Sequence, residues 1–390
     1  MIAAIEPDVA NLVPAFCDSL AGLGCLYLLA AAIAVLRFPR SSGSLKPRVE
    51  EPVSLLKPLR GLEVGLERRL EACCCQNYKG AVQLVCGVRH RTDDALIAVK
   101  TLASRHPDLS IALNIDEREH GLNRKISNLG NMLPLAAHEL LVISDSDIEV
   151  GSDYLAHIVG HLQQPGVGAV TCLYHGVAGP GKWSPMAALA INSHFLPNAV
   201  MAISLGLAKP CFGATIALYR NTLSRIGGFP AFGDCLADDY AIGEAIRSAG
   251  YKIAIPEISV GHVCFQGSLW SLLAWELRAA RTIRSVDSIG FLGTFIAHPL
   301  PLALIGALCG GRDALLLAAV AIGCRLVLCL CIEQAFGLRR QPLWLIPLRD
   351  MLSFAVYVLS HFGATVTWQD LNYRITSDGR LLAGRNRMER

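Results

Sequence analysis

Charged side chains are scarce in this chain: they make up 17% of its 390 residues, whereas hydrophobic residues make up 53%. The mean hydropathy of +0.42 exceeds what one soluble core requires, so we expect part of the chain to lie in lipid. The formal net charge of +3 is too small to indicate nucleic acid as a partner, and the basic residues lie beside apolar stretches instead of forming one long patch. A membrane surface explains their placement better.

The spacing of a zinc site is absent from the sequence, although there are 14 cysteines. Three of them are adjacent, at positions 73–75, and several others lie in apolar stretches. A disulfide scaffold is typical of short secreted chains, which this chain does not resemble. We therefore expect reduced thiols that pack as small hydrophobic side chains.

The N-terminus lacks the basic residues with which a cleaved signal peptide begins, and it carries Glu6 and Asp8 instead. Residues 13–36 are apolar apart from Asp18, and this stretch is long enough to span a bilayer. Four basic residues follow it, namely Arg37, Arg40, Lys46 and Arg48. By the positive-inside rule they place the next domain in the cytoplasm, so we expect residues 1–48 to form a transmembrane anchor.

Short apolar runs rich in β-forming residues alternate with amphipathic segments between residues 53 and 254. This alternation predicts a parallel sheet covered by helices, in one α/β domain at residues 49–268. The predicted strands are residues 53–56, 82–88, 111–114, 140–144 and 169–173, and two predicted helices are residues 63–75 and 93–104.

Three further apolar blocks follow, at residues 289–308, 314–332 and 343–366. If all three cross the membrane, the arginine-rich tail lies outside, against the positive-inside tendency. We therefore expect one block not to span fully: the first, which contains His298 and two prolines, or the third, which contains Arg349 and Asp350. The C-terminal parts are predicted to be an interfacial amphipathic helix at 269–287, membrane helices at 288–368 and a basic tail at 369–390.

The most informative motif is an apolar strand that ends in two carboxylates, Asp145 and Asp147. Residues at positions i and i+2 of a strand point to the same side, and ligands of open α/β sheets bind at the carboxyl edge of the strands. Two such carboxylates, together with substrate phosphate oxygens, bind a divalent cation such as Mg²⁺ or Mn²⁺. Because Asp is also common in turns after strands, a solvated loop is the alternative interpretation.

A second acidic pair, Asp238 and Asp239, precedes the amphipathic run at residues 241–248. Carboxylates at this position can simply stabilise the N-terminus of a helix. In the functional interpretation, one of them is a general base that takes the proton from an acceptor hydroxyl.

A third acidic pair, Asp93 and Asp94, follows the predicted strand at 82–88. This pair is expected at the same edge of the sheet as Asp145. Capping of the next helix is the alternative role, and it is compatible with contact to a ligand.

Two basic elements complete the set. Residues 121–128 combine a glycine, two asparagines and Lys125 ahead of a helix, which suits the binding of phosphate or a nucleotide, although a solvated loop is the alternative. Arg278 and Arg281 lie three residues apart on one face of a predicted helix. They either bind a diphosphate leaving group or extend toward lipid headgroups.

Taken together and in order, these residues resemble the ceramide glucosyltransferase family of membrane glycosyltransferases, which have a GT-A (Rossmann-like) catalytic domain. The similarity covers nearly the whole chain. The fold class that it implies is α/β: a GT-A catalytic domain with N- and C-terminal transmembrane helices. The motifs that carry it are residues 53–61, Asp93-Asp94, residues 121–128, residues 143–147, residues 237–240 and Arg278-x-x-Arg281.

Three stretches, residues 143–147, 212–218 and 276–284, are most similar to the bacterial hopanoid-biosynthesis-associated branch of the family. The resemblance to that branch implies a polyol hopanoid as acceptor and an N-acetylglucosamine donor. Ceramide is the other acceptor that the family implies.

The resemblance also implies a role for each site residue. Asp94 would contact the nucleotide, Asp145 with Asp147 would bind the metal and the diphosphate, and Asp239 would be the base. Arg278 and Arg281 match the family's R-x-x-R-W element near the leaving group. Thr282 stands where tryptophan is expected, which puts an aromatic contact to the acceptor in doubt and also disfavours a processive polysaccharide synthase.

We therefore expect an inverting glycosyltransferase that moves glucose or N-acetylglucosamine from a UDP-sugar onto a hydroxyl of a membrane lipid. Its catalytic domain would face the cytoplasm at a bacterial inner membrane. A nucleotide-sugar-binding pseudoenzyme would be expected to have lost Asp239 or the acids of the D-x-D motif. A transporter or membrane scaffold would carry ionisable residues inside its spans and lack an α/β domain of this size.

Overall fold

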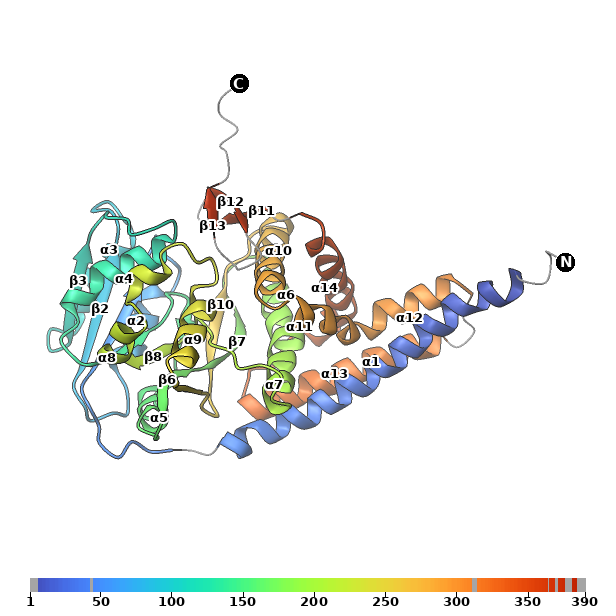
Figure 1. The fold of residues 1–390 in the computed structure, drawn as a ribbon, viewed down its shortest axis with the longest axis horizontal. Coiled ribbons are helices and arrows are strands. Elements are labelled where there is room, and N and C mark those ends of the chain that lie inside the picture. Colours follow the sequence, from blue (N-terminus) through green and yellow to red (C-terminus); the bar gives the residue numbers. More distant parts are fainter. Residues whose placement is uncertain are drawn as a thin grey trace, which may run out of the picture. The chain divides into compact units, whose positions relative to one another are not determined.

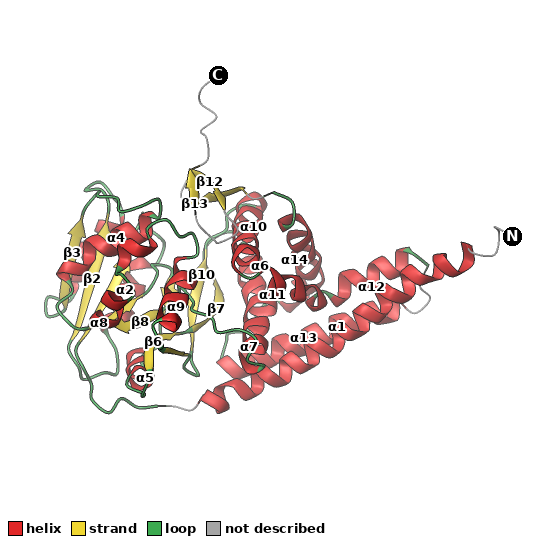
Figure 2. Cartoon of the chain, viewed as in Figure 1, coloured by secondary structure: helices red, strands yellow, loops and turns green. Residues whose placement is uncertain are grey.

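The computed structural model describes residues 6–42, 45–310, 314–363, 365–368, 371–375 and 381–383. The chain forms two compact units. The helical unit comprises Met1–Ser41, Gly181–Ala208 and Phe265–Ala364, and the α/β unit comprises Ser42–Pro180, Lys209–Cys264 and Thr365–Arg390. All the strands drawn in yellow in Figure 2 belong to the α/β unit.

The main sheet of the α/β unit has seven strands: β1 (Val53–Pro58), β2 (Val82–Val88), β3 (Ser110–Ile115), β4 (Leu140–Ile143), β6 (Val167–Thr171), β8 (Ile216–Tyr219) and β9 (Lys252–Ala254). Their order is β3-β2-β1-β4-β8-β6-β9, and β2, β3, β6 and β8 are labelled in Figure 1. Each of the five strands expected from the sequence is present within two residues of its predicted bounds.

The main sheet contains one strand, β8, that reverses the expected parallel arrangement. β1, β2, β3 and β4 are parallel, but β8 runs antiparallel between β4 and β6. The five predicted strands are thus parallel to one another, and the sheet as a whole is mixed because β8 was not predicted as a strand. The carboxyl ends of β1, β2 and β4 still meet at one edge, where the acidic motifs were expected.

A second sheet of three strands lies in the same unit, in the order β5-β10-β7: β5 (Ile148–Glu149), β10 (Ser259–Cys264) and β7 (Leu173–Ala178). β5 follows the D-x-D motif directly and pairs antiparallel with β10, with His262 opposite Ile148. This pairing brings a strand from late in the chain to the acidic motif after β4.

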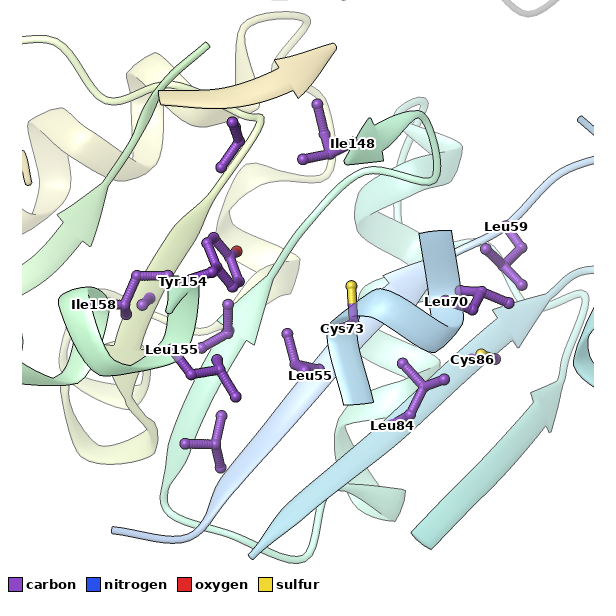
Figure 3. Packing of buried hydrophobic residues seen from close by; sticks show 14 of the residues in the cluster. Leu55, Leu59, Leu70, Cys73, Leu84, Cys86, Ile148, Tyr154, Leu155 and Ile158 are labelled. Atoms are coloured by element: carbon purple, nitrogen blue, oxygen red, sulfur yellow. The ribbon is translucent and has the colours of Figure 1, made fainter. Parts of the chain in front are cut away.

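The helices of the α/β unit are α2 (Leu66–Cys74), α3 (Ala95–Arg105), α4 (Arg124–Met132), α5 (Tyr154–Leu162), α8 (Arg220–Arg225) and α9 (Asp238–Ser248). Successive strand residues point to opposite faces of the sheet, so each face has its own core. Leu55 of β1 packs in the cluster that contains Leu70 and Leu84, drawn in Figure 3, whereas its neighbour Leu56 packs in the cluster that contains Ile126.

The helical unit contains α1 (Glu6–Ser42), α6 (Ser184–Ala190), α7 (Leu196–Ser204), α10 (Leu269–Val286), α11 (Ser288–Gly293), α12 (Pro299–Leu308), α13 (Ala314–Phe336) and α14 (Ile346–Ser360). Within the described residues, four helical stretches are long and apolar enough to cross a membrane: Leu12–Pro39, Ser184–Ser204, Ala314–Phe336 and Leu343–Ser360. The expected α/β class with apolar helices at both ends is therefore confirmed, and the chain has the character of a membrane protein.

The first C-terminal block is bent. Its two parts, Ser288–Ala297 and Pro299–Leu308, meet at an angle of 64°, and His298 lies at the break. The third block forms a continuous candidate span, and both of its charged residues are fully buried and paired: Arg349 with Glu276 of α10, and Asp350 with Arg325 of α13. Of the two blocks that the sequence left open, 289–308 and 343–366, the first is therefore the irregular one.

Residues 184–204 were expected inside the catalytic domain at 49–268, but they belong to the helical unit. The stretch has a hydropathy of 1.3, lower than the 2.7 of Ala314–Phe336, because it contains polar residues such as Asn192, Ser193 and His194. These three side chains are buried within the unit, which the sequence does not reveal.

A small sheet of β11 (Thr365–Trp368), β12 (Leu371–Ile375) and β13 (Leu381–Ala383) lies in the segment expected to be a basic tail. Arg374 belongs to β12, whereas Arg380, Arg385, Arg387 and Arg390 lie outside the described residues.

Candidate active site

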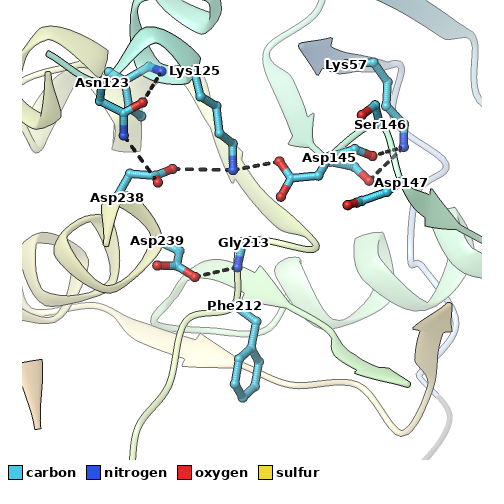
Figure 4. Close-up of polar contacts among 12 residues, drawn as sticks. Lys57, Asn123, Lys125, Asp145, Ser146, Asp147, Phe212, Gly213, Asp238 and Asp239 are labelled. Atoms are coloured by element: carbon cyan, nitrogen blue, oxygen red, sulfur yellow. Dashed lines mark hydrogen bonds and ion pairs between the residues drawn. The ribbon is translucent and has the colours of Figure 1, made fainter. Parts of the chain in front are cut away.

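The D-x-D motif forms a turn at the carboxyl end of β4. The strand ends at Ile143, and the amide of Ile148 donates a hydrogen bond of 3.3 Å to the carbonyl of Asp145. Both carboxylates point toward the side on which Lys125, Asp238 and Asp239 lie (Figure 4). The shared direction that the sequence predicted is present, but it comes from the turn and not from the alternation of a strand.

Lys125 connects two of the acidic motifs. Asn123 caps α4 by accepting a hydrogen bond of 3.1 Å from the amide of Ile126, and the helix then carries Lys125 into the site. The ammonium nitrogen of Lys125 lies 2.7 Å from Oδ1 of Asp145 and 3.5 Å from Oδ2 of Asp238 (Figure 4). Burial alone would lower the pKa of Lys125, but these two carboxylates outweigh it and raise the pKa above its ordinary value.

Asp238 and Asp239 begin α9, in its first turn, after the N-cap residue Ala237. The pKa of Asp238 is raised by burial, although Lys125 opposes the shift. The two carboxylates therefore differ in their surroundings: Asp238 faces the ammonium of Lys125, and Asp239 faces the amide of Gly213. The helix dipole stabilises negative charge here, so the structural role and a functional role coincide.

Asp239 has the properties of a general base. Its Oδ2 accepts a hydrogen bond of 2.9 Å from the amide of Gly213, which holds the carboxylate in one orientation (Figure 4). A Cβ atom at position 213 would lie 3.2 Å from that oxygen, so glycine permits this close approach. Burial, followed by the charge of Asp238, raises the pKa of Asp239 to about 6. A base with this pKa is mostly ionised at neutral pH and can still accept a proton.

Asp147 faces His262 of β10. The Oδ1 atom of Asp147 is buried without a hydrogen-bond partner among the described residues, and Nδ1 of His262 lies 3.7 Å from it. A buried carboxylate oxygen in this condition is costly unless a ligand or cation completes its surroundings. His262 was not singled out in the sequence, because 115 residues separate it from the motif and only the pairing of β10 with β5 brings it there.

The donor set suits a divalent cation that also contacts a phosphate. Asp145 and Asp147 supply hard oxygen ligands, and His262 supplies a nitrogen beside them. In the described part of the chain, no group of three or more His, Cys, Asp or Glu side chains is placed to hold a metal ion. A cation such as Mg²⁺ usually takes one or two carboxylates and completes its shell with water and substrate phosphate.

Asp94 lies at the same sheet edge. It occupies the N-cap position of α3, after β2, but its side chain makes no capping hydrogen bond. Its neighbour Asp93 accepts hydrogen bonds from the amides of Gly61 (2.8 Å) and Ala95 (2.9 Å), and so ties the loop after β1 to α3. Because β1 lies between β2 and β4, the ends of those two strands are about 10 Å apart, within the length of a nucleotide diphosphate.

The arginines expected near the leaving group lie in the helical unit, on α10. Arg281 donates a hydrogen bond of 2.8 Å to the carbonyl of Phe362, just beyond α14. Arg284 donates to the carbonyls of His361 (3.2 Å) and Gly363 (3.1 Å). The contact of Arg278 and Arg281 with a diphosphate stays a prediction.

Lys57 is a site residue that the sequence analysis did not single out. It is fully buried in β1, and its ammonium nitrogen donates hydrogen bonds to the hydroxyl of Ser144 (3.0 Å) and to the carbonyl of Asp145 (2.8 Å). Lys57 directly follows the strand predicted at residues 53–56, and its burial was not expected, since lysine is almost never fully buried unless paired.

The chain is similar to known proteins in sequence and in structure. The sequence model of glycosyl transferase family 21 matches residues 20–381. The chain is 25% identical to ceramide glucosyltransferase 1 of Caenorhabditis elegans over 239 residues (60% of this chain, 51% of the relative), and 26% identical to ceramide glucosyltransferase 3 of that organism over 248 residues (59% and 50%). It thus spans about half the length of these curated relatives.

Among solved structures, the mannosyltransferase PcManGT of Pyrobaculum calidifontis, in complex with GDP-Man and Mn²⁺, is similar with a TM-score of 0.48 and 22% identity, covering 88% of this chain and 99% of that one. The family expected from the motifs is confirmed. Because the family model extends over nearly the whole sequence, the chain belongs to glycosyl transferase family 21.

Proposed function

We propose that the protein is an inverting glycosyltransferase that moves a hexose, glucose or N-acetylglucosamine, from a UDP-sugar onto a hydroxyl of a membrane lipid. One observation carries the proposal. Four carboxylates, Asp145, Asp147, Asp238 and Asp239, lie in one site, and Lys125 contacts two of them, Asp145 and Asp238 (Figure 4). This excess of negative charge suits a divalent cation and the diphosphate that it carries.

Asp239 is the base in this proposal. Its carboxylate takes the proton of the acceptor hydroxyl while the hydroxyl oxygen forms a bond with the anomeric carbon of the donor. The bond between that carbon and the diphosphate oxygen breaks with its electron pair, and UDP leaves. Attack from the side opposite UDP inverts the anomeric centre. The hydrogen bond from Gly213 keeps the carboxylate oriented for this transfer.

Asp145 and Asp147, with His262 beside them, would hold the divalent cation, Mg²⁺ or Mn²⁺. The cation supplies charge neutralisation for the leaving diphosphate. Lys125 holds Asp145 and Asp238 in place and adds a positive charge next to the phosphates. Asp94 would contact the nucleotide, and Arg278 and Arg281 would assist the leaving group.

The acceptor follows from the membrane character of the chain and from its relatives. Two of these are named ceramide glucosyltransferases, and a lipid acceptor accounts for the apolar helices of the helical unit. The resemblance of residues 143–147, 212–218 and 276–284 to the hopanoid-associated branch favours a polyol hopanoid over ceramide. The four basic residues that follow the apolar stretch at 13–36 favour a cytoplasmic catalytic unit at a bacterial inner membrane.

Release of UDP by the full-length, detergent-solubilised protein tests the proposal. With a UDP-sugar, Mn²⁺ and a bacterial polar-lipid extract, the wild-type protein should release UDP, and omission of the lipid should stop it. Asp239→Asn should bind UDP but release none from the donor above background. A protein that binds UDP without turnover on any lipid would be a nucleotide-sugar-binding pseudoenzyme.

The identity of donor and acceptor requires the product itself. Lipids of cells with and without the protein, compared by mass spectrometry, should differ by one hexose or N-acetylhexosamine on a lipid hydroxyl. A hopanoid product supports the favoured acceptor, and a ceramide product supports the alternative.

A further inference from the structure

The three residues of the D-x-D motif are held through their backbone. Each carbonyl oxygen of Asp145, Ser146 and Asp147 accepts a hydrogen bond from outside the turn. The donors are the ammonium of Lys57 for Asp145 (2.8 Å), the guanidinium of Arg69 for Ser146 (2.8 Å) and the amide of Val263 for Asp147 (2.9 Å). Two of the three donors are therefore buried cations, which is unusual for a turn at a sheet edge.

Ser146, the central residue, is held at two points. Arg69 donates to its carbonyl through Nε, and the hydroxyl of Ser146 donates a hydrogen bond of 2.9 Å to Oε1 of Glu63. Glu63 and Arg69 also form an ion pair of 2.6 Å, so the three residues close a ring. We call Glu63, Arg69 and Ser146 the turn clamp.

The clamp is anchored in the fold and shielded from water. Arg69 lies on α2 with 2% of its surface exposed, and its Nη1 donates a hydrogen bond of 2.8 Å to the carbonyl of Val64. Each of the three guanidinium nitrogens of Arg69 thus donates to a fixed partner. Since a guanidinium ion is rigid and planar, three simultaneous contacts leave Ser146 little freedom to move.

The carboxylates on either side of Ser146 lack such support of their own. Asp145 contacts Lys125, and Oδ1 of Asp147 has no hydrogen-bond partner among the described residues. Their separation and direction therefore depend on the turn that carries them. Residues that orient metal ligands in this indirect way affect metal affinity strongly, although they never touch the ion.

We propose that Glu63 and Arg69 are positioning residues, which hold Ser146 so that the carboxylates of Asp145 and Asp147 are set in advance for a cation-bound diphosphate. This inference rests on the proposed function. Neither residue has a place in the motifs from which that function was argued. Glu63 and Arg69 lie on the loop after β1 and on α2, close in sequence to each other but 77 residues or more from Ser146.

Binding of Mn²⁺ to the full-length protein in detergent, with saturating UDP, tests the clamp. Electron paramagnetic resonance of free Mn²⁺ gives the dissociation constant directly. For Arg69→Gln we expect that constant to rise about 10- to 100-fold, the range seen when residues that support metal ligands are replaced. Ser146→Ala, which loses only the hydroxyl contact to Glu63, should show a smaller rise, and excess Mn²⁺ should restore transferase activity in both variants.

Arg68→Gln is the matched control, because Arg68 is the exposed neighbour of Arg69 on α2. It should bind Mn²⁺ within about twofold of the wild-type value. Restoration of activity by Mn²⁺ separates positioning from a general loss of folded protein, which added metal at saturation would not reverse.

Wild-type affinity for Mn²⁺ in both Arg69→Gln and Ser146→Ala would overturn the clamp. If Arg69→Gln fails to fold, Ser146→Ala decides alone, since it removes no buried charge. Absence of UDP-dependent Mn²⁺ binding in the wild-type protein would overturn the proposed function, and the clamp with it.

Discussion

Arg349 and Glu276 form a two-pronged ion pair inside the helical unit, with the guanidinium nitrogens of Arg349 2.6 and 2.7 Å from the two carboxylate oxygens of Glu276. Arg349 is fully buried on α14, and Glu276 is 7% exposed on α10. Glu276 stands two residues before Arg278, so the pair fixes the helix that carries the arginine motif. The paired geometry also explains how an apolar helix tolerates a charged residue.

Removal of one partner of this pair should be far worse than removal of both. Glu276→Gln leaves the buried charge of Arg349 uncompensated, and Arg349→Met leaves that of Glu276 uncompensated. Either single loss costs about 3–5 kcal/mol of stability. The double variant should be more stable than the sum of the single losses predicts. Thermal unfolding in detergent gives the comparison, and additive losses would contradict the pairing. Arg340→Gln, which removes an exposed arginine near Glu333, is a suitable control with little expected effect.

Asp239→Asn should abolish transfer without loss of fold. A general base typically contributes about 10²- to 10⁴-fold in rate, so kcat should fall by that factor while UDP affinity is retained. In the wild-type enzyme, kcat/KM should rise with pH up to about 6 and then level, because the ionised carboxylate is the active form. A profile that is flat between pH 5 and 7 would remove Asp239 as the base.

The same raised pKa predicts a gain in stability for Asp239→Asn. The folded-state pKa of about 6 lies above the ordinary value, so folding favours the protonated form. The stability associated with that proton is present at low pH and is lost as pH rises through about 6. At pH 7.5, without metal, Asp239→Asn should therefore unfold about 2–4 °C higher than wild type. The difference should shrink as the pH falls through about 6 and vanish below the ordinary value of 3.8.

The sequence predicted the strands and the acidic motifs for a definite physical reason. Apolar runs report burial wherever they occur, and glycine, proline and acidic residues at their ends report turns at the sheet edge. The five predicted strands and the acids that follow β2 and β4 are therefore where the pattern placed them. β8 was not among the predicted strands, and the antiparallel pairing that it brings to the main sheet was therefore missed.

Other features of the site were beyond the sequence because they join distant segments. Lys125 was interpreted as a phosphate ligand, but the carboxylates that it contacts are 20 and 113 residues away in the chain. His262 and Arg69 reach the D-x-D turn only through strand and helix packing. The segment at 184–204 was not recognised as a candidate membrane helix, because its buried polar residues lower its hydropathy.

Lys125→Met should move the pH dependence of the reaction upward. The ammonium of Lys125 lowers the pKa of Asp239, whereas burial and the charge of Asp238 raise it. Without Lys125, the pKa of Asp239 should therefore rise further. The loss in kcat/KM should therefore be larger at pH 6.5 than at pH 8.5. Lys125→Arg, which keeps the charge, is the control and should keep the wild-type profile shape. An equal loss at both pH values would indicate that Lys125 acts only on the donor phosphates.

Removal of the divalent cation should stop the reaction through a loss of donor binding. A chelator should abolish UDP release, and Mn²⁺ or Mg²⁺ should restore it. Without the cation, the four carboxylates of the site repel the negatively charged diphosphate. Asp147→Asn keeps the shape of the side chain but removes one charged ligand, so it should require about 10- to 100-fold more metal for half-maximal activity. Asp153→Asn, at an exposed aspartate after β5, should leave the requirement unchanged. Full activity of the wild-type protein in the chelator would show that Lys125 and the arginines alone support the leaving group.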